Sequence, residues 1–64
     1  MNITPKQKII LDLGLQGLNT IEIAERLNLS PYTISTHLRF VRAAMGVHTT
    51  QEAIEIYKKT KGKK

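Results

Sequence analysis

Apolar residues recur along this chain at the spacing of three and four positions that is typical of amphipathic helices. The clearest case is the stripe Ile34, Leu38, Val41 and Met45, which predicts one buried face on a helix spanning 31–45. Three shorter segments show the same spacing, whereas few runs alternate at period two, so we expect no strand. The buried faces expected on the shorter segments are Ile9, Ile10 and Leu13 with Gln16 and Gly17, then Ile23, Ala24 and Leu27, and finally Ile54 and Tyr57 with Ala53 and Ile56 alongside.

Each of these segments opens with a signal for the start of a helix. Three starts carry the capping-box pattern, in which a short polar side chain and a Glu or Gln three residues later satisfy each other's backbone N–H groups. These starts are Thr4–Gln7, Asn19–Glu22 and Thr49–Glu52. The remaining start is Ser30 followed by Pro31, a capping hydroxyl before a proline at the first helical position.

The ends of the segments are marked by residues that tolerate the left-handed conformation of a helix C-cap. They are Gly17, Asn28, Gly46 and Gly62. The expected fold class is therefore all-α, a four-helix bundle. Its predicted helices span 5–16, 20–27, 31–45 and 50–59.

Only Asn28, Leu29 and Ser30 connect the second and third predicted helices. So short a turn joins two helices at a steep angle, as in a DNA-binding helix-turn-helix, whose second helix enters the major groove of double-stranded DNA. We expect Phe40, which lies off the apolar stripe, to be partly buried. Once the stripe is removed, the residues left for the outward surface of helix 31–45 are Tyr32, Thr33, Ser35, Thr36, Arg39, Phe40, Arg42 and Ala43.

The distribution of charge says more than the net charge of +5. The five lysines of 58–64, KKTKGKK, equal the whole excess, because residues 1–57 hold five basic and five acidic side chains. We therefore divide the chain into a domain at 1–60 and a basic tail at 61–64, which either strengthens DNA binding by counterion release or only aids solubility. Residues 26–51 contain three arginines and no acidic residue, which suits a groove lined by phosphates.

Length and composition exclude several classes of protein. A chain of 64 residues buries about 60% of its unfolded surface, so its stability is marginal. Because it has no Cys to form disulfides, we expect self-association to supply further stability. No nucleophile and base are paired and no glycine-rich phosphate loop is present, so we expect no enzymatic activity, no cofactor and no metal site, with His37 structural and His48 in a solvated loop. No apolar run could span a bilayer, which predicts a cytoplasmic protein without a membrane partner.

The sequence also resembles a known family of helix-turn-helix domains. The stretch GLNTIEIAERLNLSPYTISTHLRFVRAAMGV resembles the LuxR or GerE-type helix-turn-helix, and ITPKQKIIL resembles the opening of that domain. The likeness covers about residues 3–57. It is carried by three motifs that occur in register: EIAERL, the pattern Thr33-Ile34-x-x-His37-Leu38, and Gly46-Val47.

This resemblance implies a bacterial or phage-encoded regulator that is associated with the nucleoid. Such a regulator binds an inverted repeat in DNA as a homodimer, and its fourth helix supplies the dimer contact. The positions that contact bases in the family fall on Ser35, Thr36 and Arg39. Where the family commonly has basic residues, this chain has Ser35 and the pair Ala43-Ala44, so its groove-facing charge is lower. The resemblance assigns phosphate contacts to Asn19, Thr20, Ser30 and Thr33, to which we add Tyr32 and Arg42, and the expected dimer contact consists of Ala53, Ile54, Ile56 and Tyr57.

Other interpretations remain open at this stage. A chain that starts at Met1 without a receiver or ligand domain is either a stand-alone regulator or a fragment of a longer protein. A protein-interaction module would instead pair through its fourth helix with a larger regulator and inhibit it, and RNA polymerase is a further candidate partner. Region four of sigma factors has a similar helix pair, but the Gly46-Val47 turn and the fourth helix fit it less well.

Overall fold

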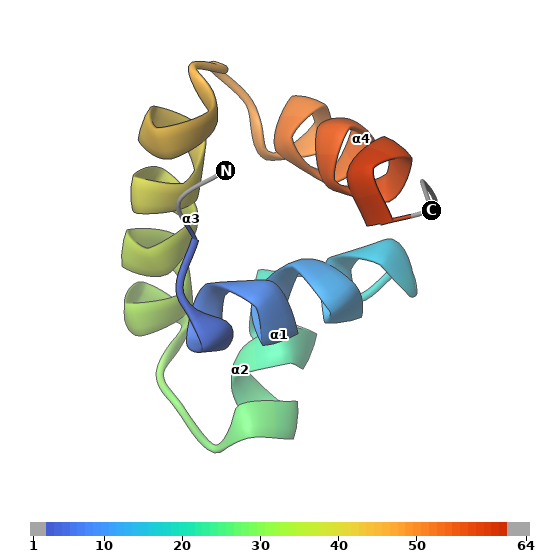
Figure 1. Ribbon diagram of the computed structural model, residues 1–64. Coiled ribbons are helices and arrows are strands. Elements are labelled where there is room, and N and C mark those ends of the chain that lie inside the picture. The colour runs from blue at the N-terminus through green and yellow to red at the C-terminus, as the bar shows by residue number, and fades with distance from the viewer. Residues whose placement is uncertain (1–2, 62–64) are drawn as a thin grey trace.

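The computed structural model describes residues 3–61, and within them the chain forms four α-helices and no strand (Figure 1). The all-helical prediction is confirmed, and the predicted bounds differ only at the ends of the first and last helices. The predicted stop at Gly62 lies outside the described residues, as does the basic tail 61–64 apart from the backbone of residue 61. The helices are α1 (Pro5–Leu15), α2 (Thr20–Leu27), α3 (Pro31–Met45) and α4 (Thr50–Lys61).

The predicted caps form at the starts of α1, α2 and α3. The Thr4 hydroxyl accepts from the Gln7 backbone N–H at 3.2 Å, while the Thr4 N–H donates to Gln7 Oε1 at 3.0 Å. The same reciprocal pair joins Asn19 and Glu22 at 2.8 and 2.9 Å. Because these bonds span only three residues, they are fixed by local sequence and need no tertiary contact.

The helix ends also agree with the sequence. Asn28 has a φ of 59° and Gly46 a φ of 71°, both in the left-handed region. Gly17 follows the end of α1 with a φ of 94°. The chain therefore changes direction at the predicted stops, so each turn starts the next helix in a new direction.

The start of α4 carries the third predicted capping box. Glu52 Oε1 accepts from the backbone N–H groups of His48 and Thr49 at 3.2 and 3.1 Å and from the Thr49 hydroxyl at 3.2 Å. In return the Glu52 N–H donates to Thr49 Oγ1 at 3.1 Å. The His48 N–H first, and then the two Thr49 donors, favour the charged carboxylate and lower the pKa of Glu52 below its ordinary value of 4.5.

This box makes part of the stability of α4 depend on acid. Because the folded pKa of Glu52 is lowered, its contribution is present above pH 4.5 and is lost as the pH falls through the folded value. We expect Glu52→Gln to remove that part of the acid dependence, and Thr49→Ala to cost about 1 kcal/mol at neutral pH. Urea unfolding followed by circular dichroism at several acidic pH values measures both effects. Glu55→Gln, at an exposed position of the same helix, is the matched control, and equal acid dependence in the two Gln variants would contradict the assignment.

Two clusters make up the hydrophobic core, and α1 lies between them. The first cluster joins α1, α2 and α3 around the fully buried Ile10 and Ile34. The second joins α1, α3 and α4 around the fully buried Leu11 and Val41. Other buried members are Leu13, Ile23, Ala24 and Leu38 in the first cluster and Ala53 and Tyr57 in the second.

This arrangement corrects the buried face predicted for the first helix. Ile9, expected in the core, is 46% exposed, whereas Leu11, which was not expected there, is completely buried. The prediction assumed a single apolar stripe, but a helix packed between two clusters buries two sides. Ile10 and Leu11 are adjacent in sequence and therefore point about 100° apart, each into a different cluster.

A partly buried hydrogen bond and a close approach hold α4 against α1. The Tyr57 hydroxyl donates to Asp12 Oδ1 at 2.8 Å. Burial of the phenol and, secondarily, the bond to the Asp12 carboxylate raise the pKa of Tyr57 to about 12. One turn before Tyr57 on α4, Ile54 lies next to Gly14 of α1. A Cβ added at Gly14 would lie 2.9 Å from Cδ1 of Ile54, so the two helices meet where a glycine leaves room.

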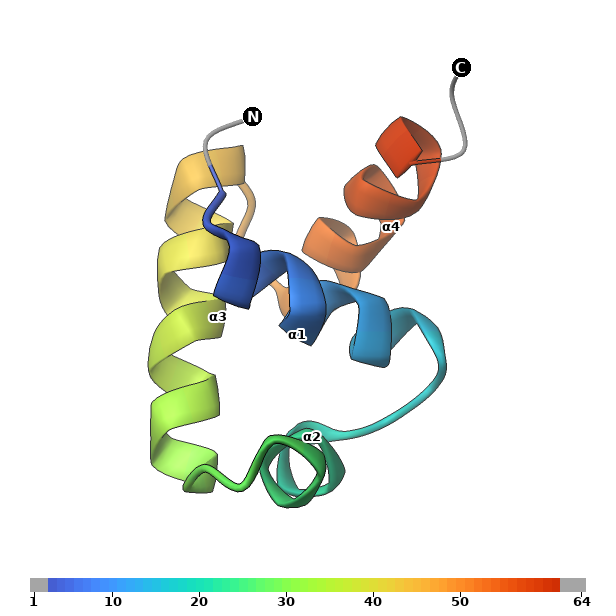
Figure 2. The same cartoon turned by 60° about the horizontal axis from the view of Figure 1, so that its bottom comes forward.

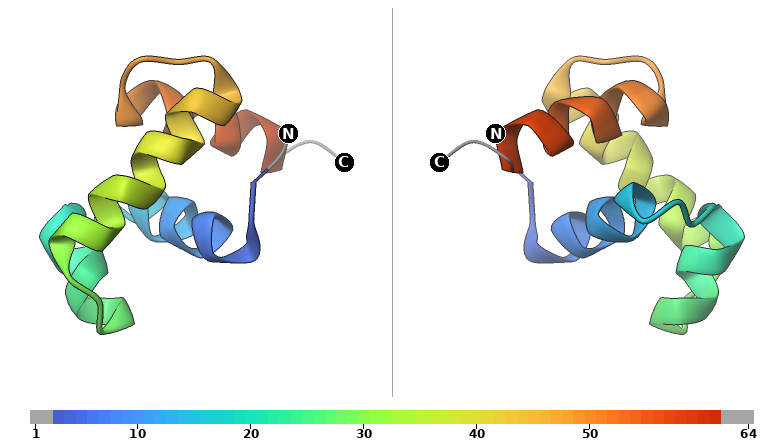
Figure 3. Two further views of the ribbon diagram at one scale, coloured as in Figure 1. Left: turned by 90° about the vertical axis from the view of Figure 1, so that its left-hand side faces the viewer. Right: turned by 90° about the vertical axis from the view of Figure 1, so that its right-hand side faces the viewer.

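The third helix lies along one side of the molecule. It contacts α1, α2 and α4, and in Figures 1 and 2 these three helices all lie on the same side of it. The left panel of Figure 3 looks at the side of α3 that faces away from the other helices, and there α3 crosses in front of them along most of its length. The outward side of α3 is therefore not covered by another helix.

Candidate nucleic-acid interface

The turn between α2 and α3 fixes the start of the uncovered helix. After Asn28 the Leu29 N–H donates to the Ala24 carbonyl at 2.8 Å, and the Leu29 side chain packs against the first core cluster. Ser30 then caps α3 by accepting from the Thr33 N–H at 3.1 Å. These local bonds, together with the first core cluster that α2 and α3 share, hold the two helices as a helix-turn-helix pair.

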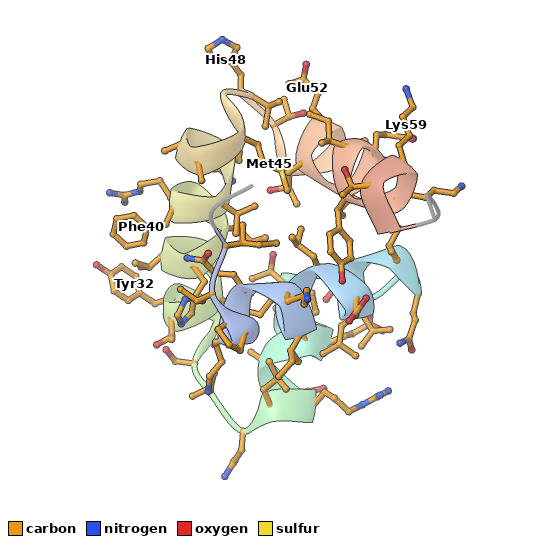
Figure 4. The ribbon with its side chains drawn as sticks, viewed as in Figure 1. Tyr32, Phe40, Met45, His48, Glu52 and Lys59 are labelled. Atoms are coloured by element: carbon orange, nitrogen blue, oxygen red, sulfur yellow. The ribbon has the colours of Figure 1, made fainter. Side chains whose placement is uncertain are left out.

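The uncovered side of α3 carries polar, basic and aromatic side chains. Figure 4 shows Tyr32 and Phe40 projecting from it, away from α1 and α4. Tyr32 is 78% exposed and Phe40 is 58% exposed, so the partial burial expected for Phe40 is wrong. The reason is that α3 already fills the core with Ile34, Leu38 and Val41, which leaves no partner for a ring on its far side.

The three residues predicted to contact bases lie on this side. Ser35 and Arg39 are exposed and stand one turn apart, so their side chains are neighbours on the helix surface. Thr36 is half-buried, and its hydroxyl donates to the Tyr32 carbonyl at 3.0 Å. With its hydrogen used in this bond, the Thr36 hydroxyl can act toward a base as an acceptor but not as a donor.

Five of the six residues predicted to contact phosphate lie at the starts of α2 and α3. Asn19 and Ser30 both use their side-chain oxygens as caps, and the Ser30 and Thr33 hydroxyls are 2.9 Å apart in a further hydrogen bond. Thr20 is half-buried and Tyr32 is exposed. The side chains of Asn19, Ser30 and Thr33 are therefore positioned by hydrogen bonds at the starts of the helices.

Arg42 is tied to another part of the chain. Its guanidinium Nη1 donates to the Thr50 hydroxyl at 3.0 Å and so joins the last turns of α3 to the first residue of α4. A phosphate contact by Arg42 would compete with this bond or share the guanidinium with it. No sequence signal pairs these two residues, because the turn between α3 and α4 decides whether they meet.

The predicted dimer contact is corrected for two of its four residues. Ala53 is completely buried and Tyr57 is 5% exposed, and both pack inside the chain's own second cluster. Ile54 packs partly against the same cluster, while Ile56 is half-buried. The apolar residues on several sides of α4 suggested a second chain, but most of them complete the core of a single chain.

A family comparison identifies this arrangement of helices. The model of the luxR family of bacterial regulatory proteins matches residues 1–57, which include the helix-turn-helix and most of α4. The chain belongs to this family. LuxR-type domains are DNA-binding helix-turn-helix domains, in agreement with the resemblance of the sequence motifs.

The LuxR-type domain also has relatives among curated proteins. Three matching proteins, one from Mycobacterium bovis and two from Mycobacterium tuberculosis, are named as HTH-type transcriptional regulators. Each is 33% identical over 54 residues, a match that covers 84% of this chain but 6% of the relative. No solved structure matches the chain.

Three further observations on this LuxR-type domain concern metal ions, membranes and its two histidines. Across residues 3–61 no group of three or more His, Asp or Glu side chains is arranged to hold a metal ion. No helix in the same part of the chain is long and apolar enough to cross a bilayer. His37 is half-buried on α3, and His48 is exposed in the turn before α4.

Proposed function

We propose that this LuxR-type domain is a sequence-specific regulator of transcription that inserts α3 into the major groove of duplex DNA. The observation that carries the proposal is the uncovered side of α3, which presents Ser35, Thr36 and Arg39 within a stretch, 26–51, that has no acidic residue. The names of the mycobacterial relatives support a role in transcription.

The side chains suit this task chemically. Arg39 can donate to O6 and N7 of a guanine as a bidentate pair, and Ser35 can donate to or accept from any base edge. Thr36 accepts, which favours an exocyclic amino group of adenine or cytosine. Phosphate contacts set the position of α3 in the groove, and we assign them to Asn19, Thr20, Ser30, Tyr32, Thr33 and Arg42.

Two copies of the chain are needed to read a full operator. The longest dimension of the described part is 31 Å, and major grooves on one face of DNA repeat about every 34 Å. One domain therefore covers one half-site. We propose an inverted repeat bound by a homodimer whose contact uses the outer surface of α4 around Ile56, since Ala53 and Tyr57 are committed to the core.

Selection of random duplex DNA by the purified full chain at near-physiological salt tests the proposal. We expect enrichment of an inverted repeat with half-sites about one helical turn apart. Ile56→Asp is expected to retain the half-site sequence but lose the repeat. Enrichment of single half-sites by the unaltered chain would overturn the dimer alone.

Failure to enrich any sequence would overturn DNA reading itself. A second selection with a chain that ends at Thr60 separates sequence reading from the general attraction of the lysine tail for phosphates. We expect weaker binding of all DNA but the same enriched sequence. Retention that disappears with the tail, without any enriched sequence, would redirect the search to a protein partner such as a larger regulator.

A further inference from the structure

An aromatic ring with no polar atom stands on the side of α3 proposed to face DNA. Phe40 is 58% exposed and follows Arg39 directly, four residues after Thr36. Residues four apart on a helix lie on the same side, so Phe40 extends the surface formed by Ser35, Thr36 and Arg39 toward the C-terminal half of α3. Figure 4 shows its ring directed away from the body of the domain.

The chemistry of this ring limits what it can contact in DNA. Phenylalanine has neither a donor nor an acceptor, so it gains nothing from a phosphate oxygen or from the polar edge of a base. The C5-methyl group of thymine is the apolar feature that base edges present in the major groove. Tyr32, at the other end of the same surface, differs because its hydroxyl can bond a phosphate.

We propose that Phe40 is a specificity-determining residue that packs on the C5-methyl group of a thymine in each half-site. This inference rests on the proposed function, since it requires α3 to lie in the major groove. Phe40 is five positions after Ser35, a rise of about 7.5 Å along α3, so the thymine and the base that Ser35 contacts belong to the same half-site.

Charge favours DNA over a protein as the occupant of this surface. Arg39 is exposed one turn after Ser35 on the same helix as Phe40, and no acidic residue occurs in α3. An apolar ring on a helix that carries arginines and no acidic residue complements a groove whose rims are phosphates and whose floor carries methyl groups. Ile9 is also an exposed apolar side chain, but it lies on α1, where the acidic Asp12 follows three residues later.

Replacing thymine by deoxyuridine removes only the methyl group and so tests the contact directly. We expect one such replacement per half-site of the selected operator to weaken binding by the unaltered protein about fourfold. This corresponds to about 0.8 kcal/mol for one buried carbon at 1.4 kcal/mol per tenfold. Phe40→Ala should bind the thymine and deoxyuridine operators equally well.

Ile9→Ala is the matched control, because it removes another exposed apolar side chain from α1, on the opposite side of α3. This variant should keep the full fourfold difference, and circular dichroism should show all three proteins folded. A difference of the same size in Phe40→Ala, or no effect of deoxyuridine at any position, would overturn the inference while leaving sequence-specific binding intact. Unchanged DNA preference in Phe40→Ala would point to a protein partner for the ring, whereas a protein that selects no operator would overturn the proposed function and this inference together.

Discussion

Tyr57→Ala is expected to lower the free energy of unfolding by about 3 to 5 kcal/mol, the usual cost of removing a buried aromatic side chain. The ring is 5% exposed and packs with Leu11, Val41 and Ala53 between α1, α3 and α4. A domain of this size has roughly 3 to 10 kcal/mol of stability in total. The variant should therefore be largely unfolded at ambient temperature or melt far below the unaltered protein.

Thermal and urea denaturation followed by circular dichroism measure this loss. Tyr32→Ala is the matched control, because Tyr32 is 78% exposed on α3 and its loss should change stability by no more than about 0.5 kcal/mol. From the sequence we expected Tyr57 on the apolar face of its helix and also in contact with a second chain. If Tyr57→Ala stayed folded but became monomeric, the contact with a second chain would be supported and the burial of Tyr57 refuted.

The hydroxyl of Tyr57 adds a dependence on alkaline pH. Its pKa is raised to about 12 in the folded chain, whereas an unfolded tyrosine titrates near pH 10. Between these values the folded state holds the proton that the unfolded state releases, so stability is complete below about pH 10 and falls as the pH rises toward 12. Tyr57→Phe should lack this part of the alkaline loss, and its persistence in Tyr57→Phe would assign it to other groups.

Arg39→Ala is expected to weaken binding to the selected operator by about 1 to 3 kcal/mol, or roughly 5- to 150-fold, and to relax the preference at one base pair. The side chain is exposed, so its loss should leave the fold and melting temperature unchanged. The expected loss is large because the variant removes both hydrogen bonds of a bidentate contact with guanine. Equilibrium binding to the operator and to an unrelated duplex measures both the affinity and the preference.

Arg26→Ala removes the same charge from an exposed position at the end of α2. We expect it to weaken binding to operator and unrelated DNA by similar factors, as a general electrostatic effect would. Arg39→Ala should instead reduce the ratio of the two affinities. Similar losses on both duplexes in the Arg39 variant would show that Arg39 contacts phosphate rather than a base.

Local sequence determined where the helices begin and end. The capping bonds of Thr4 with Gln7, Asn19 with Glu22 and Thr49 with Glu52 each span three residues, so no distant part of the chain affects whether they can form. The left-handed stops at Asn28 and Gly46 are equally local. For the same reason the three-residue turn and the acid-free outward surface of α3 could be predicted from the sequence.

Tertiary structure decided which apolar side chains the chain uses for its own core. A periodic pattern shows that a helix has apolar sides but not how many neighbours cover them, and α1 buries two sides where one was expected. The same limit led us to place Tyr57 in a contact with a second chain, although its hydroxyl bonds Asp12, 45 residues away in the same chain. The bond between Arg42 and Thr50 and the exposure of Phe40 likewise depend on how the helices pack, because neither is fixed by neighbours in sequence.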